Sequence, residues 1–562
     1  MASIRSYVHL IRNRMKPPKA CRQCRESKRK CLRRSLAVGE PCDTCRVRSL
    51  PCASSLSRVP PSPLPLLPRP EPTPSLSNTS TPTSSKTEGT DLPLHTAVLL
   101  VDYYLDKLHN RPHSLFHPAK LRQEVQDGSI SRILLLAICS MGSRFALDEE
   151  TRALEAGLME ESKRTLLANL ENVCVENIQA CILIANLCAA HLNPSSEALF
   201  FRTGISLSHI MQLGTSTVGS RLVDLEIHRR IWWSLFMADR WSSSSLRLLP
   251  QIRDTELAVD LPMDEAIFES LDPTATQLEK PWQPGIWAFK ISLVQLFGPI
   301  QQLNRHSVNR SMTAEDIESS ILSLSQQLET WEESLPDNIK WKEEMLDWHI
   351  NRGTGGPYVA LHLGYHHYSV LLYFRFLSSQ EPRSPASSMY HSRCKAHASA
   401  YSNLVKLARG RQGCEVVYPT VGHMAVVSSS VLLHTLLFGE EADLKSARDA
   451  LNANFAAIVE LRQYWPNTAP MIERLATFQN FCLLSCDSRT HDFDDWMVRF
   501  LTEYSLPLEE KDIQHVRSGM DYDIDSFSAR TQALTQQGRY TSFQTDTSDA
   551  YSLQLHEFDY LI

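Results

Sequence analysis

Residues 21–52 read CRQCRESKRKCLRRSLAVGEPCDTCRVRSLPC, and this stretch decides the fold of the N-terminal part of the chain. Its six cysteines follow the spacing C-x2-C-x6-C-x10-C-x2-C-x6-C, which is one half-motif repeated after a short loop. Four of the six residues between Cys24 and Cys31 are Arg or Lys, and two Arg lie between Cys45 and Cys52. Thiolates at such short spacing are typical zinc ligands, and clustered basic side chains bind phosphate. The stretch therefore predicts a metal-folded module that contacts DNA.

The number of cysteines limits how the metal is bound. Two independent four-sulfur zinc sites need eight thiolates, whereas six thiolates are enough if two sulfurs bridge both metals. A single zinc ribbon would leave two cysteines and the duplicated spacing unexplained. Disulfides suit small secreted chains, whereas this chain has 562 residues and 14 cysteines, most of the others lying singly in apolar segments. We expect two zinc ions, which stabilise a module with almost no core of its own.

The charges of the chain are divided unevenly. The overall net charge is −6, but residues 1–58 hold 15 basic and 3 acidic side chains, so the remainder carries −18. A basic head on an acidic body predicts a DNA-binding module attached to a domain that does not bind DNA. The Arg-rich segment 1–20 would also suit a transit peptide, although a nuclear location explains the same charges. No apolar run approaches the length that spans a bilayer, so we expect no membrane partner.

Composition divides the rest of the chain into three parts. Residues 53–93 contain ten prolines among Ser, Thr and Leu, which predicts a disordered linker without a coiled coil. Residues 94–502 show apolar side chains at helical spacing and almost no strand signals, which predicts a large all-α domain. Within that domain we expect 264–280 to be a weakly patterned acidic connection.

The C-terminal segment, residues 503–562, mixes acids with aromatic residues. Examples are DYDIDSF at 521–527 and EFDYLI at 557–562. Such alternation is typical of activation segments that fold on a partner, here the transcription machinery or a co-activator. A solvated tail or a last docked helix remains the alternative.

The cysteine pattern resembles the fungal Zn2Cys6 binuclear cluster family, and the resemblance covers residues 21–52. It implies that Cys21 and Cys42 bridge the two zinc ions. It also implies that the other ligands divide between the two sites, as Cys24 and Cys31 for one and Cys45 and Cys52 for the other.

The same resemblance assigns DNA contacts. It places the segment between Cys24 and Cys31 in the major groove at a CGG-like triplet, with Lys28 at the base edges. We expect the neighbouring basic residues to contact phosphates: Arg25, Arg29, Lys30, Arg46 and Arg48. Ser27 stands where the family often has a basic residue, so one potential contact is altered.

A second resemblance covers about residues 95–380. Residues 226–240, EIHRRIWWSLFMADR, are similar to a signature of the fungal-specific transcription factor domain, with His228 in place of an arginine. The resemblance implies a regulatory role and leaves open a small-molecule effector. From helical spacing alone, we expect Trp232, Trp233 and Phe236 in the core.

Other residues of the body favour structural roles. Arg229, Arg230 and Asp239 are candidates for partly buried ion pairs. Two groups of histidines have the spacing of metal ligands on a helix. Pro112 interrupts the helix of the first group, His109, His113 and His117. The apolar residues around the second group, His362, His366 and His367, indicate a core helix instead.

The sequence predicts a nuclear, zinc-dependent regulator of RNA polymerase II transcription, most simply an activator of a metabolic or biosynthetic gene set. Without a visible zipper, either the body mediates homodimerisation or a monomer binds half-sites. The alternative is a zinc-dependent nuclear interaction protein that does not read bases. The chain lacks a phosphate-binding glycine loop and a G-x-S-x-G elbow, so we do not expect an enzyme.

Overall fold

The computed structural model describes residues 42–46, 92–213, 221–254, 259–278, 281–309, 311–377, 384–484, 493–508 and 531–541. The chain divides into two compact units, Met1–Lys86 and Thr87–Ile562. In the first unit, the described residues form the short helix α3 (Asp43–Arg46). The predicted linker at 53–93 lies almost wholly outside the described residues.

The second unit is helical throughout the part that the structure describes, with two isolated β-bridges and no strand. This confirms the all-α prediction for the body. Its α-helices are α4 (Leu94–Lys107), α5 (Pro118–Asp127), α6 (Arg132–Ser143), α7 (Glu149–Ala168), α8 (Val175–Ala190), α9 (Pro194–Ile210), α10 (Leu222–Ser245), α11 (Glu265–Glu269), α12 (Ile286–Val308), α13 (Ala314–Ser334), α14 (Glu343–Asn351), α15 (Gly355–Tyr373), α16 (Pro385–Arg409), α17 (Pro419–Phe438), α18 (Glu441–Arg462), α19 (Ala469–Leu484) and α20 (Asp495–Thr502). Two 3-10 helices are η2 (Phe374–Leu377) and η3 (Pro466–Thr468), and residues 531–536 are also helical.

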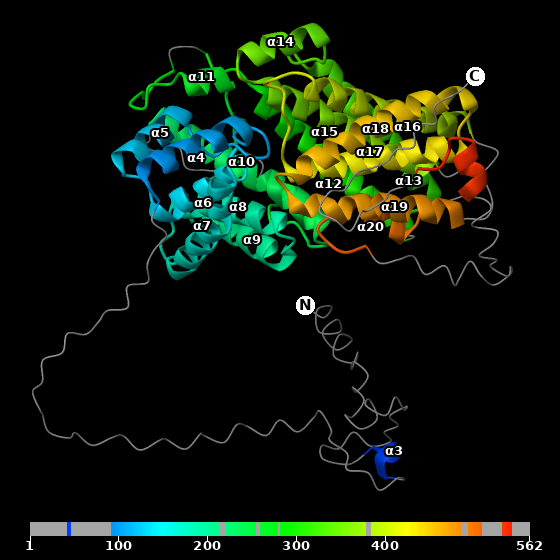
Figure 1. Cartoon of the computed structure of the whole chain (residues 1–562), viewed down its shortest axis with the longest axis horizontal. Helices are drawn as coiled ribbons and strands as arrows, with labels where there is room; N and C mark the ends of the chain where they lie inside the picture. Colours follow the sequence, from blue (N-terminus) through cyan, green and yellow to red (C-terminus); the bar gives the residue numbers. More distant parts are fainter. Residues whose placement is uncertain are drawn as a thin grey trace, which may run out of the picture. The chain divides into compact units, whose positions relative to one another are not determined.

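These helices form two groups. Consecutive helices pack as pairs, most extensively α6 with α7, α8 with α9, α15 with α16, and α17 with α18. Figure 1 shows α4 to α9 at one end of the body and α15 to α19 at the other. Helix α10 packs on α9 and α12, and α12 packs on α15, so these two long helices connect the groups.

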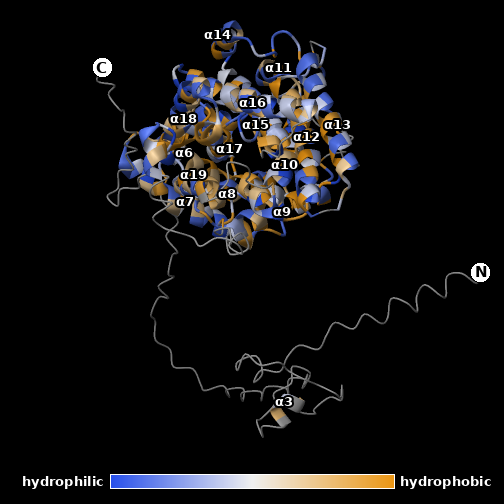
Figure 2. Ribbon diagram, turned by 90° about the vertical axis from the view of Figure 1, so that its right-hand side faces the viewer, coloured by the Kyte–Doolittle hydropathy of each residue, from blue (hydrophilic) through white to orange (hydrophobic). Residues whose placement is uncertain are grey.

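Helix α17 is a deeply buried element of the second group. By length and composition it could cross a membrane, so the expectation that no run is long and apolar enough was wrong for this helix. However, 94% of its apolar stretch is buried inside the body. It packs on α15, α16, α18 and α19, and Figure 2 shows apolar ribbon concentrated among these helices. We conclude that α17 is a core helix.

Helix α10 carries a buried ion pair that ties three segments together. Glu226 and Arg230 are both 0% exposed, and Arg230 Nε donates to Glu226 Oε1 at 2.9 Å. The other guanidinium nitrogens donate to Ser114 Oγ at 3.1 Å and to the Met263 carbonyl at 2.7 Å. Glu226 in turn accepts from the Met263 amide at 2.9 Å. The pair thus holds α10 against the segments that precede α5 and α11.

Further residues of the same signature behave as the sequence predicts. Trp232, Trp233 and Phe236 are at most 4% exposed, which confirms their place in the core. Asp239 is buried and accepts from the amides of Gln251 and Ile252 at 2.9 Å each. The carboxylate therefore fixes the turn that follows α10.

The acidic connection 264–280 has more structure than its composition indicates. It contains α11, and Glu265 in this helix is 2% exposed. Its carboxylate accepts from the amides of Ile286 and Trp287, at 3.0 and 3.1 Å, which are the first amides of α12. Burial raises the pKa of Glu265, while nearby Arg230 and the Trp287 amide favour the ionised form. The residue anchors the N-terminus of α12.

Part of the predicted tail packs on the body. Arg448 of α18 donates to Thr541 Oγ1 at 2.7 Å, and Gln479 of α19 donates to the Thr541 carbonyl at 2.7 Å. Arg539 donates to the carbonyl of Leu436 in α17 at 3.1 Å. Residues 531–541 are therefore a docked segment. Both acidic-aromatic motifs, at 521–527 and 557–562, lie outside the described residues.

The buried ion pair generates a prediction about stability. Replacing Arg230 with Met removes the donor to the Met263 carbonyl and leaves the buried Glu226 carboxylate with Arg229 as its one remaining cationic partner among the described residues. We expect the free energy of unfolding to fall by about 3–5 kcal/mol. Urea unfolding of the full chain, followed by circular dichroism, measures this loss.

Arg122→Met is the matched control, because Arg122 pairs with Asp102 at 2.8 Å and both side chains are about half exposed. This variant should lose no more than about 1 kcal/mol. The double variant Arg230→Met and Glu226→Met should recover part of the loss. Equal effects of the two single variants would contradict the structural role given to Arg230.

Candidate functional site

The second C-x2-C pair of the N-terminal module lies on one helical turn. Cys45 donates its amide hydrogen to the Cys42 carbonyl at 3.0 Å, at the start of α3. Both cysteines are 1% exposed. Residues three apart on a helical turn are neighbours on its surface, so this turn can present two thiolates to one metal. The donor chemistry of this pair fits zinc.

The other residues predicted for this site lie outside the described part of the chain. Arg46 ends α3, and the structure describes its backbone only. The structure thus brings together one of the predicted cysteine pairs. Nothing is described for the remaining ligands and DNA contacts, which stay predictions: Cys21, Cys24, Cys31, Cys52, Arg25, Lys28, Arg29, Lys30 and Arg48.

The first histidine group of the body has structural roles. His109, His113 and His117 lie between α4 and α5, and all three are at most 5% exposed. His113 Nε2 lies 2.9 Å from the Tyr104 hydroxyl. His117 caps α5, because its Nδ1 accepts from the Lys120 amide at 3.2 Å. His113 and His117 therefore serve different contacts, whereas neither ring nitrogen of His109 has a hydrogen-bond partner.

The second histidine group also divides among different partners. His362 Nε2 hydrogen-bonds to the Ile339 carbonyl at 2.9 Å, and His366 Nδ1 lies 3.0 Å from His397 Nδ1. His367 is buried on the same helix, α15. Among the residues that the structure describes, no three His, Cys, Asp or Glu side chains are grouped to hold a metal ion.

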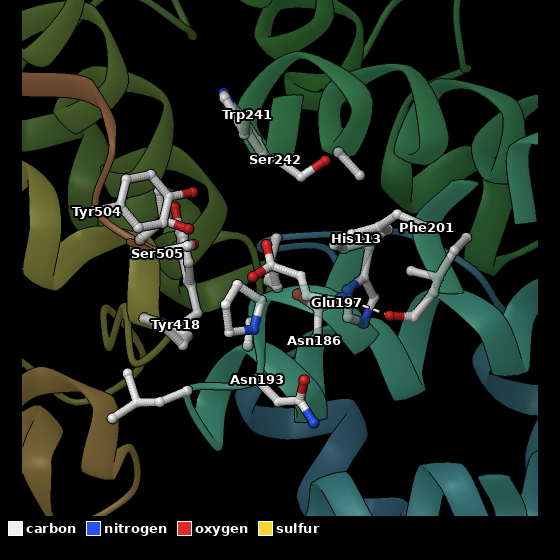
Figure 3. A pocket seen from close by; sticks show the side chains of 18 of the residues that line it. His113, Asn186, Asn193, Glu197, Phe201, Trp241, Ser242, Tyr418, Tyr504 and Ser505 are labelled. Atoms are coloured by element: carbon white, nitrogen blue, oxygen red, sulfur yellow. Dashed lines mark hydrogen bonds between the residues drawn. The ribbon is translucent and has the colours of Figure 1, made fainter. Parts of the chain in front are cut away.

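A cavity lies where the two helix groups of the body meet. Helices α8, α9 and α10 line one side, and the start of α17, α19 and residues 504–505 line the other. Its volume, measured as space open to the centre of a water molecule, is about 70 Å³. Figure 3 shows side chains from both groups turned toward this space. Sequence reasoning missed the cavity, because its walls come from segments far apart in the chain.

Glu197 of α9 is the acidic residue of this cavity (Figure 3). It is 4% exposed, and its Oε2 has no hydrogen-bond partner. Burial raises the pKa of Glu197 from its ordinary 4.5 to about 8, although a hydrogen bond with Ser505 acts in the opposite direction. At neutral pH, the carboxyl group of the empty cavity is therefore mostly protonated.

Aromatic side chains form much of the remaining wall. Trp241 is held in place because its Nε1 donates to the Tyr368 hydroxyl at 2.8 Å. Tyr418 and Tyr504 line the opposite side, and burial raises the pKa of both phenols, so they stay neutral. The buried cation Lys290 does not line the cavity; its Nζ lies 5.7 Å from the centre of the Trp241 ring.

The pKa of Glu197 leads to a prediction about pH. Between about pH 5 and 8 the folded protein keeps a proton on Glu197 that the unfolded chain has lost. The contribution of this residue to the free energy of unfolding therefore falls as pH rises through that range, and levels off above it. Gln at this position does not titrate. We expect Glu197→Gln to gain stability relative to the unmodified protein as pH rises from 5 to 8.

Urea unfolding of both proteins at several pH values between 5 and 9 measures the difference. Titration of all other groups is common to both proteins and cancels. A stability difference that stays constant with pH would show that Glu197 is not protonated in the folded state.

Comparison with known protein families agrees with the helical signature. Residues 101–346 match the family described as the fungal specific transcription factor domain. The match runs from α4 into α14 and includes the whole of α10. The domain resemblance stated from residues 226–240 is thereby confirmed.

Several curated proteins are similar to this chain. The Zn(2)-C6 fungal-type transcription factor FTF1c of Fusarium oxysporum f. sp. lycopersici is 21% identical, over 67% of this chain and 45% of the relative. Two uncharacterized transcriptional regulatory proteins of Schizosaccharomyces pombe, C1327.01c and C530.11c, are 22% and 24% identical. Their matches cover 53% and 68% of this chain, and 34% and 52% of the relatives.

The chain thus spans about half the length of the curated relatives it matches, or less. The domain match and the relatives agree with the cysteine pattern at residues 21–52. The chain therefore contains a region that matches the fungal specific transcription factor domain, and it is similar to Zn(2)-C6 fungal-type transcription factors.

Proposed function

We propose that this chain is a zinc-dependent, sequence-specific DNA-binding factor that acts with RNA polymerase II in the nucleus. In this proposal it activates a metabolic or biosynthetic gene set and has no enzymatic activity. The observation that carries the proposal is the duplicated six-cysteine pattern with its basic filling at residues 21–52. Regulation of transcription is also what the names of the relatives describe.

Zinc would fold the N-terminal module. Six thiolates hold two ions when Cys21 and Cys42 bridge them, and the other four cysteines complete the two sites. The turn that carries Cys42 and Cys45 supports this assignment for one pair. Because so short a module has little core, metal binding supplies most of its folding free energy.

DNA recognition would come from the basic segment between Cys24 and Cys31. Lys28 can donate to guanine O6 and N7, which suits a CGG-like triplet. Its basic neighbours and those near α3 would neutralise phosphates and fix the register, so binding should weaken steeply with salt. One triplet gives little specificity, and two copies of the chain on paired half-sites would supply more.

The helical body and the C-terminal segment would control when transcription is activated. The helical body controls activity in this proposal, and the acidic-aromatic motifs near 521–527 and 557–562 recruit the transcription machinery or co-activators. The uneven distribution of charge supports these separate roles. The residues beyond 58 carry a net charge of −18, so DNA repels the body and the tail.

A second candidate function is a zinc-dependent nuclear co-regulator that does not read bases. The presence of Ser27 favours it, because this residue replaces a basic side chain that often contributes to DNA contacts in the family. In that case the chain would act through its helical body alone.

Metal analysis tests the zinc assignment. We expect two zinc ions per chain by native mass spectrometry, because six thiolates with two bridging sulfurs satisfy two tetrahedral metals. Cys42→Ser should lose both ions, since it removes a bridge, whereas Cys394→Ser in the body should keep both. One ion or none in the unmodified protein would rule out the binuclear cluster.

Base readout is tested by two substitutions in the basic module. On a duplex with a CGG triplet, Lys28→Ala should weaken binding by about 1–3 kcal/mol and reduce discrimination against a scrambled duplex. Arg48→Ala should weaken binding to both duplexes alike and lower the salt dependence by about one counterion. Fluorescence anisotropy of labelled duplexes measures both effects. Unchanged discrimination in Lys28→Ala would instead favour the co-regulator.

A further inference from the structure

We propose that the cavity between the two helix groups binds a small organic cation, a protonated amine with a compact apolar body, whose ammonium group pairs with Glu197. This proposal goes beyond the DNA-binding function and does not depend on it. It rests on the carboxyl group, on the aromatic wall and on the size of the cavity.

Glu197 is an exception among the buried acids of the described residues. Five acidic side chains are less than a tenth exposed: Glu197, Glu226, Asp239, Glu265 and Glu503. Each of the other four has an arginine nitrogen within 4.0 Å. Arg230 lies beside both Glu226 and Glu265. Arg240 lies beside Asp239, and Arg247 lies beside Glu503. None of the residues that line the cavity, all of them described, is Lys or Arg.

A buried carboxyl group without a cation is costly when it is ionised, and one oxygen of Glu197 has no hydrogen-bond partner even in the neutral form. An ammonium group inside the cavity would supply the missing positive charge and donate to that oxygen. The lining offers no such partner to a carboxylate or a phosphate. The charge pattern therefore selects cations over anions.

The aromatic wall favours the same class of ligand. Phe201, Trp241, Tyr418 and Tyr504 surround the space around Glu197 (Figure 3). Such rings attract cations through their faces and bury apolar groups at the same time. The cavity volume of about 70 Å³ corresponds to roughly five to seven water-sized positions, which limits the ligand to a small molecule.

The remaining titratable groups around the cavity do not compete with Glu197 for the role of counter-ion. Burial and the charge of Lys290 lower the pKa of His113 to about 3, so this ring is neutral. Tyr418 and Tyr504 keep their protons because burial raises their pKa values. Lys290 opposes a cation from behind the aromatic wall, but burial lowers its pKa to about 7, so part of its charge is lost at pH 8.

Three compounds with the same ring and different charge test the proposal on the full chain: cyclohexylamine, cyclohexanol and cyclohexanecarboxylate. At pH 8, millimolar cyclohexylamine should raise the thermal unfolding midpoint saturably, by on the order of 1–2 °C. The alcohol and the carboxylate should raise it less than half as much. The affinity for the amine should also rise between pH 6.5 and 8, because Glu197 must release its proton to pair with it.

Glu197→Gln keeps the size and hydrogen-bonding ability of the side chain but removes its charge, so the amine should bind at least about tenfold more weakly. Glu160→Gln is the matched control, because it removes an exposed carboxylate from α7 and should leave the shift unchanged. Ala238→Leu, which fills the cavity from α10 without altering Glu197, should also abolish the shift. The Ala238→Leu variant tests the cavity independently if the Glu197→Gln variant does not fold.

Four results would overturn the proposal. They are equal shifts with cyclohexanol or cyclohexanecarboxylate, a shift that persists in folded Glu197→Gln, a shift that persists in Ala238→Leu, and no shift with any of the three compounds. A shift with the amine alone that both cavity variants lose would establish the site.

Discussion

The buried guanidinium of Arg230 is the constraint on which the first half of the helical body depends. Removing such a charge from water costs several kcal/mol, so the fold must surround it with acceptors. The Glu226 carboxylate, the Ser114 hydroxyl and the Met263 carbonyl meet this requirement, and the Phe268 ring lies 4.4 Å from the guanidinium carbon. Because these groups come from separate segments, none of the segments can shift without leaving a buried charge unpaired.

Sequence reasoning predicted this part of the fold because its signal is local. The apolar residues of 226–240 recur at helical spacing, and the charged residues of the same signature were candidates for partly buried ion pairs. The function of Glu265 could not be predicted in the same way. Its role at the N-terminus of α12 depends on a contact with residues 286 and 287, about twenty positions away. Composition alone made its segment look like an unstructured acidic connection.

The two candidate sites differ for the same reason. The zinc ligands are recognisable because zinc binding needs thiolates at fixed short spacing, and all six cysteines lie in one continuous stretch of the sequence. The cavity has no such signature. Glu197 lies in a sequence that reads as an ordinary amphipathic helix, and Ser505 lies in a segment that was expected to be a tail. Only the packing of the two helix groups brings these residues together.

The position of the cavity also determines what a bound ligand could do. Glu197 belongs to the first helix group, whereas Tyr418 opens α17 in the second. A ligand held by both would lose contacts whenever the groups separated, so its affinity would differ between the two arrangements. A ligand shifts a conformational equilibrium only by such a difference in affinity. An ionised Glu197 would enlarge the difference, because an ion pair is stronger while the aromatic residues of the second group exclude water from it. A cavity at this junction is therefore better placed to bias the arrangement of the body than one enclosed within either group.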